Sequence, residues 1–328
     1  TPTLAPPTIR VTTPPDPAPV AQAFFEAWKL DDYAAMYASL DAASQQAISL
    51  EDFTNRYLGV AVEAAIPQGN VGFQVLASQV LNPQEAAVDY QVTLTSVLVG
   101  PLTRENEMRL GLEGGQWRIR WNETLILPDL AGGLKLRMVN YVPARGNIFD
   151  RNGNPLAAPG EGYAVGLVPG EIDPELESKM LTLLSRASGY SAEYIYSLYG
   201  KLGLDYGFYV PFFSVPAEML NPYYNALVGY TGVNVNFFSG RFYPGAAPQT
   251  IGFVSALQPE EVDHYRRLGY QWTERVGRAG LEQAMEQYLG GIHGGALYLD
   301  NPATQQSQKL GEGFITPGED VVTTLDEA

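Results

Sequence analysis

Three short segments of the sequence place arginine or an acidic residue beside glycine. Residues 145–157 read Arg-Gly-Asn-Ile-Phe-Asp-Arg-Asn-Gly-Asn-Pro-Leu-Ala, residues 241–245 read Arg-Phe-Tyr-Pro-Gly, and residues 278–282 read Arg-Ala-Gly-Leu-Glu. The chemistry open to these residue types is ion pairing, because the planar guanidinium of arginine forms two parallel hydrogen bonds with a carboxylate. A buried charge is tolerated only when it is paired and hydrogen-bonded.

We therefore expect the charges of these segments to meet in one structural ion-pair cluster, with the pairing between individual residues left open. Its members are Arg145, Asp150, Arg151, Arg241 and Glu282. The alternative is a set of separate surface charges, each of which would stabilise the fold little. The glycines of the same segments would let backbones approach closely or turn tightly. They are Gly146, Gly153, Gly245 and Gly280.

The sequence has few of the residues that metal sites or thiol catalysis require. The sequence has no cysteine, which excludes disulfides, thiol catalysis and thiolate metal sites. It has two histidines, His264 and His293, so a zinc site built from several histidines is not expected. We accordingly expect no metal and no cofactor.

The spacing of apolar residues indicates where helices and strands lie, and together these elements predict an α+β protein. Val20, Phe24 and Trp28 recur at helical spacing, and Ser49 followed by Asp52 is typical of a helix start. From residue 88 the period changes to two, with apolar and polar residues alternating over 88–95, 108–113 and 117–122. Helices followed by long antiparallel strands indicate a curved sheet covered by a helical layer.

Further along, the pattern returns to helices and isolated strands. Asp173-Pro174 is typical of a helix start, with Asp as N-cap and Pro at the first helical position. A second helix is predicted after Ser191, a third after Pro259, and a fourth over 281–289, while residues 295–326 are expected to be extended.

The charged segments together resemble a known family. The string at 145–157, the Arg-x-Tyr-Pro-Gly string at 241–245, Gly-Leu-Glu at 280–282 and Pro-Gly-Glu-Asp-Val at 317–321 occur in the order of the dimerisation module of class B penicillin-binding proteins. The exit string Trp117-Arg-Ile-Arg-Trp121 to Pro128 resembles the end of the nuclear-transport-factor-like domain of the methicillin-resistance type, although Leu127 stands where that type has an aromatic residue.

The resemblance implies three parts. Residues 1–17 would be a Pro/Thr-rich linker, residues 18–133 a nuclear-transport-factor-like (cystatin-like cone) domain, and residues 134–328 an elongated α+β pedestal. The start at Thr1 suggests that an upstream membrane anchor was removed. The family's catalytic strings are Ser-x-x-Lys, Ser-x-Asn and Lys-Thr-Gly. None of them occurs in the sequence, so the chain itself is not expected to be an enzyme.

By this resemblance the whole protein would be a serine-type D,D-transpeptidase that cross-links peptidoglycan outside the cell membrane. The chain would position the transpeptidase domain and offer surface to cell-wall synthesis proteins and peptidoglycan, with membrane contact only through the missing N-terminal anchor. The competing hypothesis is an independent extracytoplasmic module that binds or senses cell-wall fragments.

The charge balance gives a first prediction. With a net charge of −16, the chain lacks the basic surface that phosphate recognition needs, so we expect no binding to nucleic acid near physiological ionic strength. An electrophoretic mobility shift with double- and single-stranded DNA and with RNA checks it. A shift at micromolar protein would contradict it.

Overall fold

The structure is a computed structural model that describes residues 14–203, 205–243 and 248–326. The chain forms two compact units, each assembled from separate stretches of sequence. Unit 1 contains the chain up to Ala144, then 256–275 and 291–317, and unit 2 contains 145–255, 276–290 and 318 to the end. The chain therefore passes between the units five times, and each unit is described by itself below.

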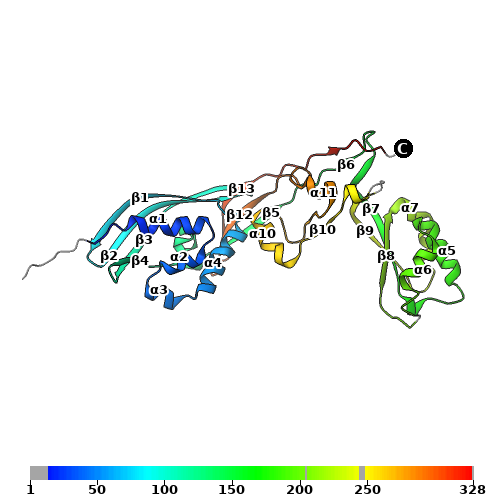
Figure 1. The fold of residues 1–328 in the computed structure, drawn as a ribbon, viewed down its shortest axis with the longest axis horizontal. Helices are drawn as coiled ribbons and strands as arrows, with labels where there is room; N and C mark the ends of the chain where they lie inside the picture. Colours follow the sequence, from blue (N-terminus) through cyan, green and yellow to red (C-terminus); the bar gives the residue numbers. More distant parts are fainter. Residues whose placement is uncertain (1–13, 204, 244–247, 327–328) are drawn as a thin grey trace, which may run out of the picture. The chain divides into compact units, whose positions relative to one another are not determined.

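Four helices and an antiparallel sheet open unit 1 (Figure 1). The helices are α1 (Ala18–Lys29), α2 (Tyr33–Ala38), α3 (Ala42–Ala47) and α4 (Leu50–Glu63). The strands are β1 (Val71–Asn82), β2 (Glu85–Ser96), β3 (Gly100–Glu113) and β4 (Gln116–Ile119), paired in that order. Short 3₁₀ turns follow at Glu123–Leu125 and Pro128–Gly133.

Local sequence explains these elements. The side chains of Asp32, Asp41 and Ser49 accept hydrogen bonds from the first turns of α2, α3 and α4, as N-caps do. The helix start expected at Ser49 is confirmed, with its hydroxyl 3.0 Å from the backbone nitrogen of Asp52. In β2 the alternating residues are buried, which places one face of the sheet against the helices. They are Ala86, Val88, Tyr90, Val92 and Leu94.

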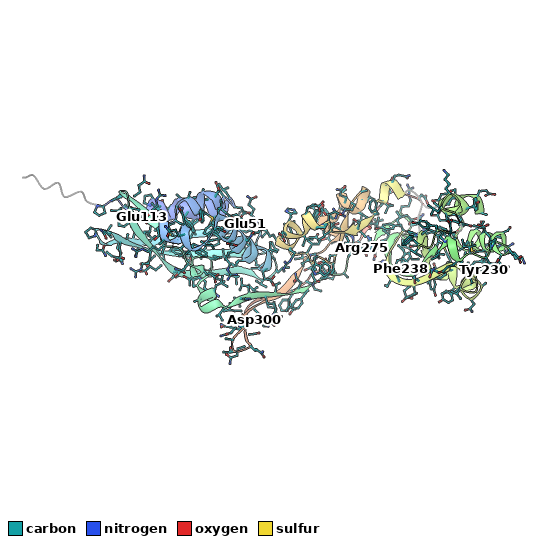
Figure 2. The ribbon with its side chains drawn as sticks, turned by 90° about the horizontal axis from the view of Figure 1, so that it is seen from below. Glu51, Glu113, Tyr230, Phe238, Arg275 and Asp300 are labelled. Carbon is teal, nitrogen blue, oxygen red and sulfur yellow. The ribbon has the colours of Figure 1, made fainter. Side chains whose placement is uncertain are left out.

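A second sheet belongs to the same unit. It has the order β13-β12-β5, with β5 (Lys135–Tyr141), β12 (Gly294–Asn301) and β13 (Gln306–Gly313) all antiparallel. Asp300, near the end of β12, pairs with Arg137 of β5 at 2.6 Å (Figure 2). Helix α10 (Val262–Arg267), entered through a 3₁₀ turn at Pro259–Glu261, contacts α4.

The core of unit 1 includes residues from both sheets. Leu297 and Leu299 of β12 belong to the same buried cluster as Phe24, Tyr57 and Trp117. The compact unit therefore differs from the linear division after residue 133, because apolar side chains from the far end of the chain complete this core.

Unit 2 is built on a five-stranded sheet. Its strands are β6 (Ile148–Phe149), β7 (Pro155–Leu167), β8 (Val210–Pro216), β9 (Val233–Phe242) and β14 (Val321–Val322). Strand β7 pairs with β6, β8 and β9, and β14 runs parallel to β6. Helices α5 (Glu177–Ser188) and α6 (Ala192–Tyr199) share a buried apolar cluster with this sheet, as do the short α7 (Ala217–Leu220) and α8 (Tyr224–Leu227).

Shorter elements complete the chain: 3₁₀ turns at Pro169–Glu171 and Asn221–Tyr223, then α9 (Pro248–Ile251), α11 (Gly280–Ala284) and α12 (Glu286–Leu289). Strands β10 (Val254–Ala256) and β11 (Arg275–Gly277) pair with each other. The predicted α+β class is confirmed.

Two local predictions were wrong. The helix expected to start at Asp173-Pro174 begins at Glu177, because the Asp173 carboxylate accepts the N–H of Glu175 and closes a turn instead. The single helix expected over 281–289 is divided at Met285 into α11 and α12. The helix predicted after Ser191 is confirmed as α6, and the Ser191 hydroxyl accepts the N–H of Tyr194 at 3.1 Å as its N-cap.

The shared core of unit 1 gives a second prediction. Replacing the fully buried Leu297 by alanine should cost about 2–5 kcal/mol of unfolding free energy, because a cavity opens against the N-terminal helices and sheet. Hydrogen exchange should accelerate in β2 as well as in β12. The control is Val139→Ala, whose side chain on the neighbouring β5 is 38% exposed. Faster exchange confined to β12 would contradict the shared core.

Candidate functional site

The Glu282 carboxylate lies at the centre of the charged segments of unit 2. Glu282 is fully buried in the first turn of α11. Arg145, from the segment before β6, donates from Nε and Nη2 to Oε2 of Glu282 at 3.0 and 2.8 Å. Arg241, at the end of β9, donates from Nε to the other oxygen, Oε1. One carboxylate thus joins three segments that are distant in the sequence, and these three residues are called the clasp below.

A second glutamate completes the clasp's charge balance. Glu286, at the start of α12, accepts from Nη1 and Nη2 of Arg145 at 3.0 and 2.7 Å. Its Oε2 also accepts the N–H of Gly277 at 2.8 Å. Sequence reasoning did not include Glu286 in the cluster. The available signal was its position four residues after Glu282, which one helical turn brings to the same side.

Burial and charge both mark this site. Side-chain exposure is 18% for Arg145, 8% for Arg241 and 0% for Glu282. Burial alone would lower the pKa of Arg145, but its hydrogen bonds to Glu286 and Glu282 and the attraction of both carboxylates raise it. Burial, with the negative charge of Glu282, raises the pKa of the nearby Tyr243 to about 12. Arg145 is therefore held in its charged form between two carboxylates.

Glycines make the close approach around the clasp possible. A Cβ on Gly146 would lie 2.0 Å from the carbonyl oxygen of Glu319, and one on Gly280 would lie 2.3 Å from that of Thr250. Gly280 also has a φ of +56°, which favours glycine. Gly153 has a φ of +87° with open space around it, so its role is the turn after Asp150. Gly245 lies outside the described residues.

The other two residues of the expected cluster, Asp150 and Arg151, bind groups other than Glu282. Asp150 is fully buried and accepts hydrogen bonds from the backbone N–H groups of Asn152 and Asn154 at 2.8 and 2.7 Å, which closes the turn. Arg151 donates from Nε to the carbonyl of Thr324 at 3.0 Å and lies 3.8 Å from Asp326. The structure thus brings together Arg145, Arg241 and Glu282, while these contacts tie Asp150 to its turn and Arg151 to residues 324–326.

Backbone hydrogen bonds run alongside the clasp. The N–H of Gly146 donates to the carbonyl of Leu289 at 2.8 Å, and the N–H of Glu319 donates to Tyr288 at 2.9 Å. The Asp320 carboxylate accepts the N–H of Asn147 at 2.7 Å. Residues 318–322 are therefore fixed against residues 146–149 and the end of α12.

This arrangement is suited to holding segments rather than to catalysis. Both oxygens of Glu282 are engaged by arginine and the side chain is fully buried, so this carboxylate is not placed within reach of a substrate in solvent. Within the described ranges no group of three or more metal-ligating side chains occurs. Nor does any helix of the described chain have the length and apolarity to span a membrane.

Comparison with known proteins matches both halves of the chain to family models. Residues 16–133 match the NTF2-like N-terminal transpeptidase domain, and residues 140–323 match the penicillin-binding protein dimerisation domain, which is more than half of the chain. Both resemblances drawn from the motifs are confirmed.

Individual relatives cover the chain to different extents. Penicillin-binding protein 3 of Bacillus subtilis is 28% identical over 93% of this chain and 46% of its own length. The peptidoglycan D,D-transpeptidase MrdA of Escherichia coli is 26% identical over 58% of this chain and 31% of its own length. The chain thus spans less than half the length of the curated relatives it matches. A solved complex between the penicillin-binding protein PBP2 and MreC from Helicobacter pylori matches at 23% identity, covering 59% of this chain and 36% of that one, with a TM-score of 0.30.

The clasp gives a third prediction. Arg241→Ala leaves the fully buried Glu282 with half of its partners, so we expect unit 2 to lose about 3–5 kcal/mol of unfolding free energy. Denaturant unfolding followed by circular dichroism measures the loss. Arg151→Ala is the matched control, because that side chain is 55% exposed and its loss should matter little. Equal destabilisation by the two variants would contradict a buried clasp.

Proposed function

Since the chain belongs to the penicillin-binding protein family, we propose that it is the non-catalytic pedestal of a protein that cross-links peptidoglycan. The relatives bear the names of a penicillin-binding protein and a peptidoglycan D,D-transpeptidase. In this proposal a serine-type transpeptidase domain lies elsewhere in the whole protein, and the chain holds that domain in place on the outer side of the cell membrane.

The clasp is the observation that carries the proposal. Through Glu282 it locks α11 to the segment before β6 and to the end of β9. The same region holds residues 318–322 through β14, which runs parallel to β6 with Val321 opposite Ile148. A pedestal needs a rigid base and a fixed exit direction, and a buried, hydrogen-bonded charge network supplies directional stiffness that apolar packing does not.

The packing of the N-terminal domain fits a supporting role. Aromatic side chains fill the space between the helices and the first sheet. The ring centroids of Phe25 and Tyr90 are 4.6 Å apart, and those of Trp28 and Tyr57 are 5.0 Å apart. All four side chains are at most 4% exposed. Such a filled interior favours a structural element over a domain that encloses a wall fragment. Its outer surface would meet cell-wall synthesis proteins, and an N-terminal anchor would tie the whole protein to the membrane.

The proposal is tested in the full-length protein. Cells that depend on it are supplied with the wild type or with Glu282→Gln, and both peptidoglycan cross-linking and acylation by penicillin are measured in the same membranes. We expect cross-linking to fall while acylation changes little, because the reactive serine is intact but displaced. Unchanged cross-linking with a broken clasp would overturn the pedestal. Micromolar binding of soluble muropeptides by the chain would support a sensing module instead.

The chain by itself gives a fourth prediction. None of its five lysines lies three residues after a serine, so the sequence lacks the Ser-x-x-Lys nucleophile that penicillin acylates. We expect no covalent labelling by a fluorescent penicillin, with the full-length protein as the positive control. A stoichiometric penicilloyl adduct on the chain in intact-mass spectrometry would refute this.

A further inference from the structure

Strand β1 is a long edge strand with no charged residue of its own. It reads Val-Gly-Phe-Gln-Val-Leu-Ala-Ser-Gln-Val-Leu-Asn over Val71–Asn82, and it contains neither a charged residue nor proline. The whole chain carries a net charge of −16. Among the described strands β1 pairs only with β2, so its other edge presents unpaired backbone groups.

The distal part of β1 is exposed on both of its faces. All seven residues from Leu76 to Asn82 are exposed, although Ala86 and Val88 on the neighbouring β2 are buried. Leu76, Val80 and Leu81 are 46%, 41% and 42% exposed. Apolar side chains on an open edge are what proteins usually avoid, because such an edge pairs with other strands.

Three other edge strands carry features that discourage pairing with a further strand. Strand β13 carries the exposed pair Lys309–Glu312, and β8 contains two prolines. Strand β4 is four residues long and includes Arg118. Strand β9 is also an edge strand, uncharged from Val233 to Gly240 and with Phe237 56% exposed, although most of its residues are half-buried. Strand β1 has no charge and no proline, and what interrupts its edge is two bulges, at Leu76 and Leu81, whose extra residues are exposed leucines.

We propose that β1 pairs antiparallel with β1 of a second copy of this chain, about a two-fold axis through the exposed half of the strand. The two four-stranded sheets then form one continuous sheet. A two-fold contact places each backbone group opposite its own equivalent, so one edge is enough for both copies. Two chains of charge −16 repel each other, and they can approach most easily along a strand whose own residues carry no charge.

The negative charge of both copies should weaken the contact. Asp16 places a negative charge against the strand, because its carboxylate accepts a hydrogen bond from the Ser78 hydroxyl at 2.9 Å. Screening of this and of the overall charge should make association tighter as salt is added. One added strand pair buries little surface, so the dimer should be weak and should form at high micromolar concentration. This contact lies in the NTF2-like domain and does not depend on the proposed pedestal function.

Sedimentation velocity of the full chain tests the proposal, from low to high micromolar protein at low and high salt. The test variant is Val80→Lys, which places two like charges across the axis. The matched control is Val97→Lys in the turn between β2 and β3, the same substitution at a side chain 40% exposed. We expect dimers in the wild type and in the control, and we expect Val80→Lys to weaken the affinity of association about tenfold or more. Thermal unfolding verifies that both variants fold.

Several outcomes would overturn the proposal. They are a wild type that stays monomeric at every concentration and salt, equal weakening by both variants, and growth into species larger than a dimer. The last would mean that the edge accepts strands without the two-fold closure. A dimer that forms at low salt and dissociates at high salt would equally contradict it, because the contact would then be electrostatic.

Discussion

The Glu282 carboxylate has no contact with solvent, and the arrangement of unit 2 depends on how its charge is balanced. Removing a carboxylate from water costs several kcal/mol, and only close, well-oriented partners offset that cost. Arg145 and Arg241 provide them from segments that lie about a hundred residues apart in the sequence. Both must be in place before the site is stable, so the clasp favours one relative placement of these segments over any looser packing.

This electrostatic requirement imposes a steric one. For the arginines to reach Glu282, the backbones around them must approach more closely than a Cβ allows. Gly146 lies against the carbonyl of Glu319, and Gly277 lies against that of Glu282 itself, where a Cβ would be 2.1 Å away. An alanine at either position would force the backbones apart and lengthen the hydrogen bonds of the clasp. The charged residues and the adjacent glycines therefore act together, which explains why they occur side by side in the sequence.

Both units depend on contacts between stretches that are distant in the sequence. Unit 1 is complete only when Leu297 and Leu299 join a core begun at Phe24, and unit 2 only when residues 276–290 return to the segment before β6. Contacts of such long sequence separation must overcome a large loop-closure entropy, so they form late in folding and slowly. The benefit is rigidity, since no unit can open at one point of the chain without loss of contacts at another.

The sequence by itself determined the α+β class, the alternation of residues 88–95 that lie in β2, and the cap at Ser49, whereas it did not indicate the preceding strand β1. These follow from rules that act within a few residues. It also indicated the three clasp residues within a predicted cluster of five charges, because glycines beside arginine and glutamate let backbones approach closely. Only the tertiary structure decided that Glu286 joins them, that Asp150 closes its own turn, that Asp173 does not begin a helix, and that β12 completes the first core. Each of these depends on which distant group lies within reach of a side chain, and local sequence rules carry no such information.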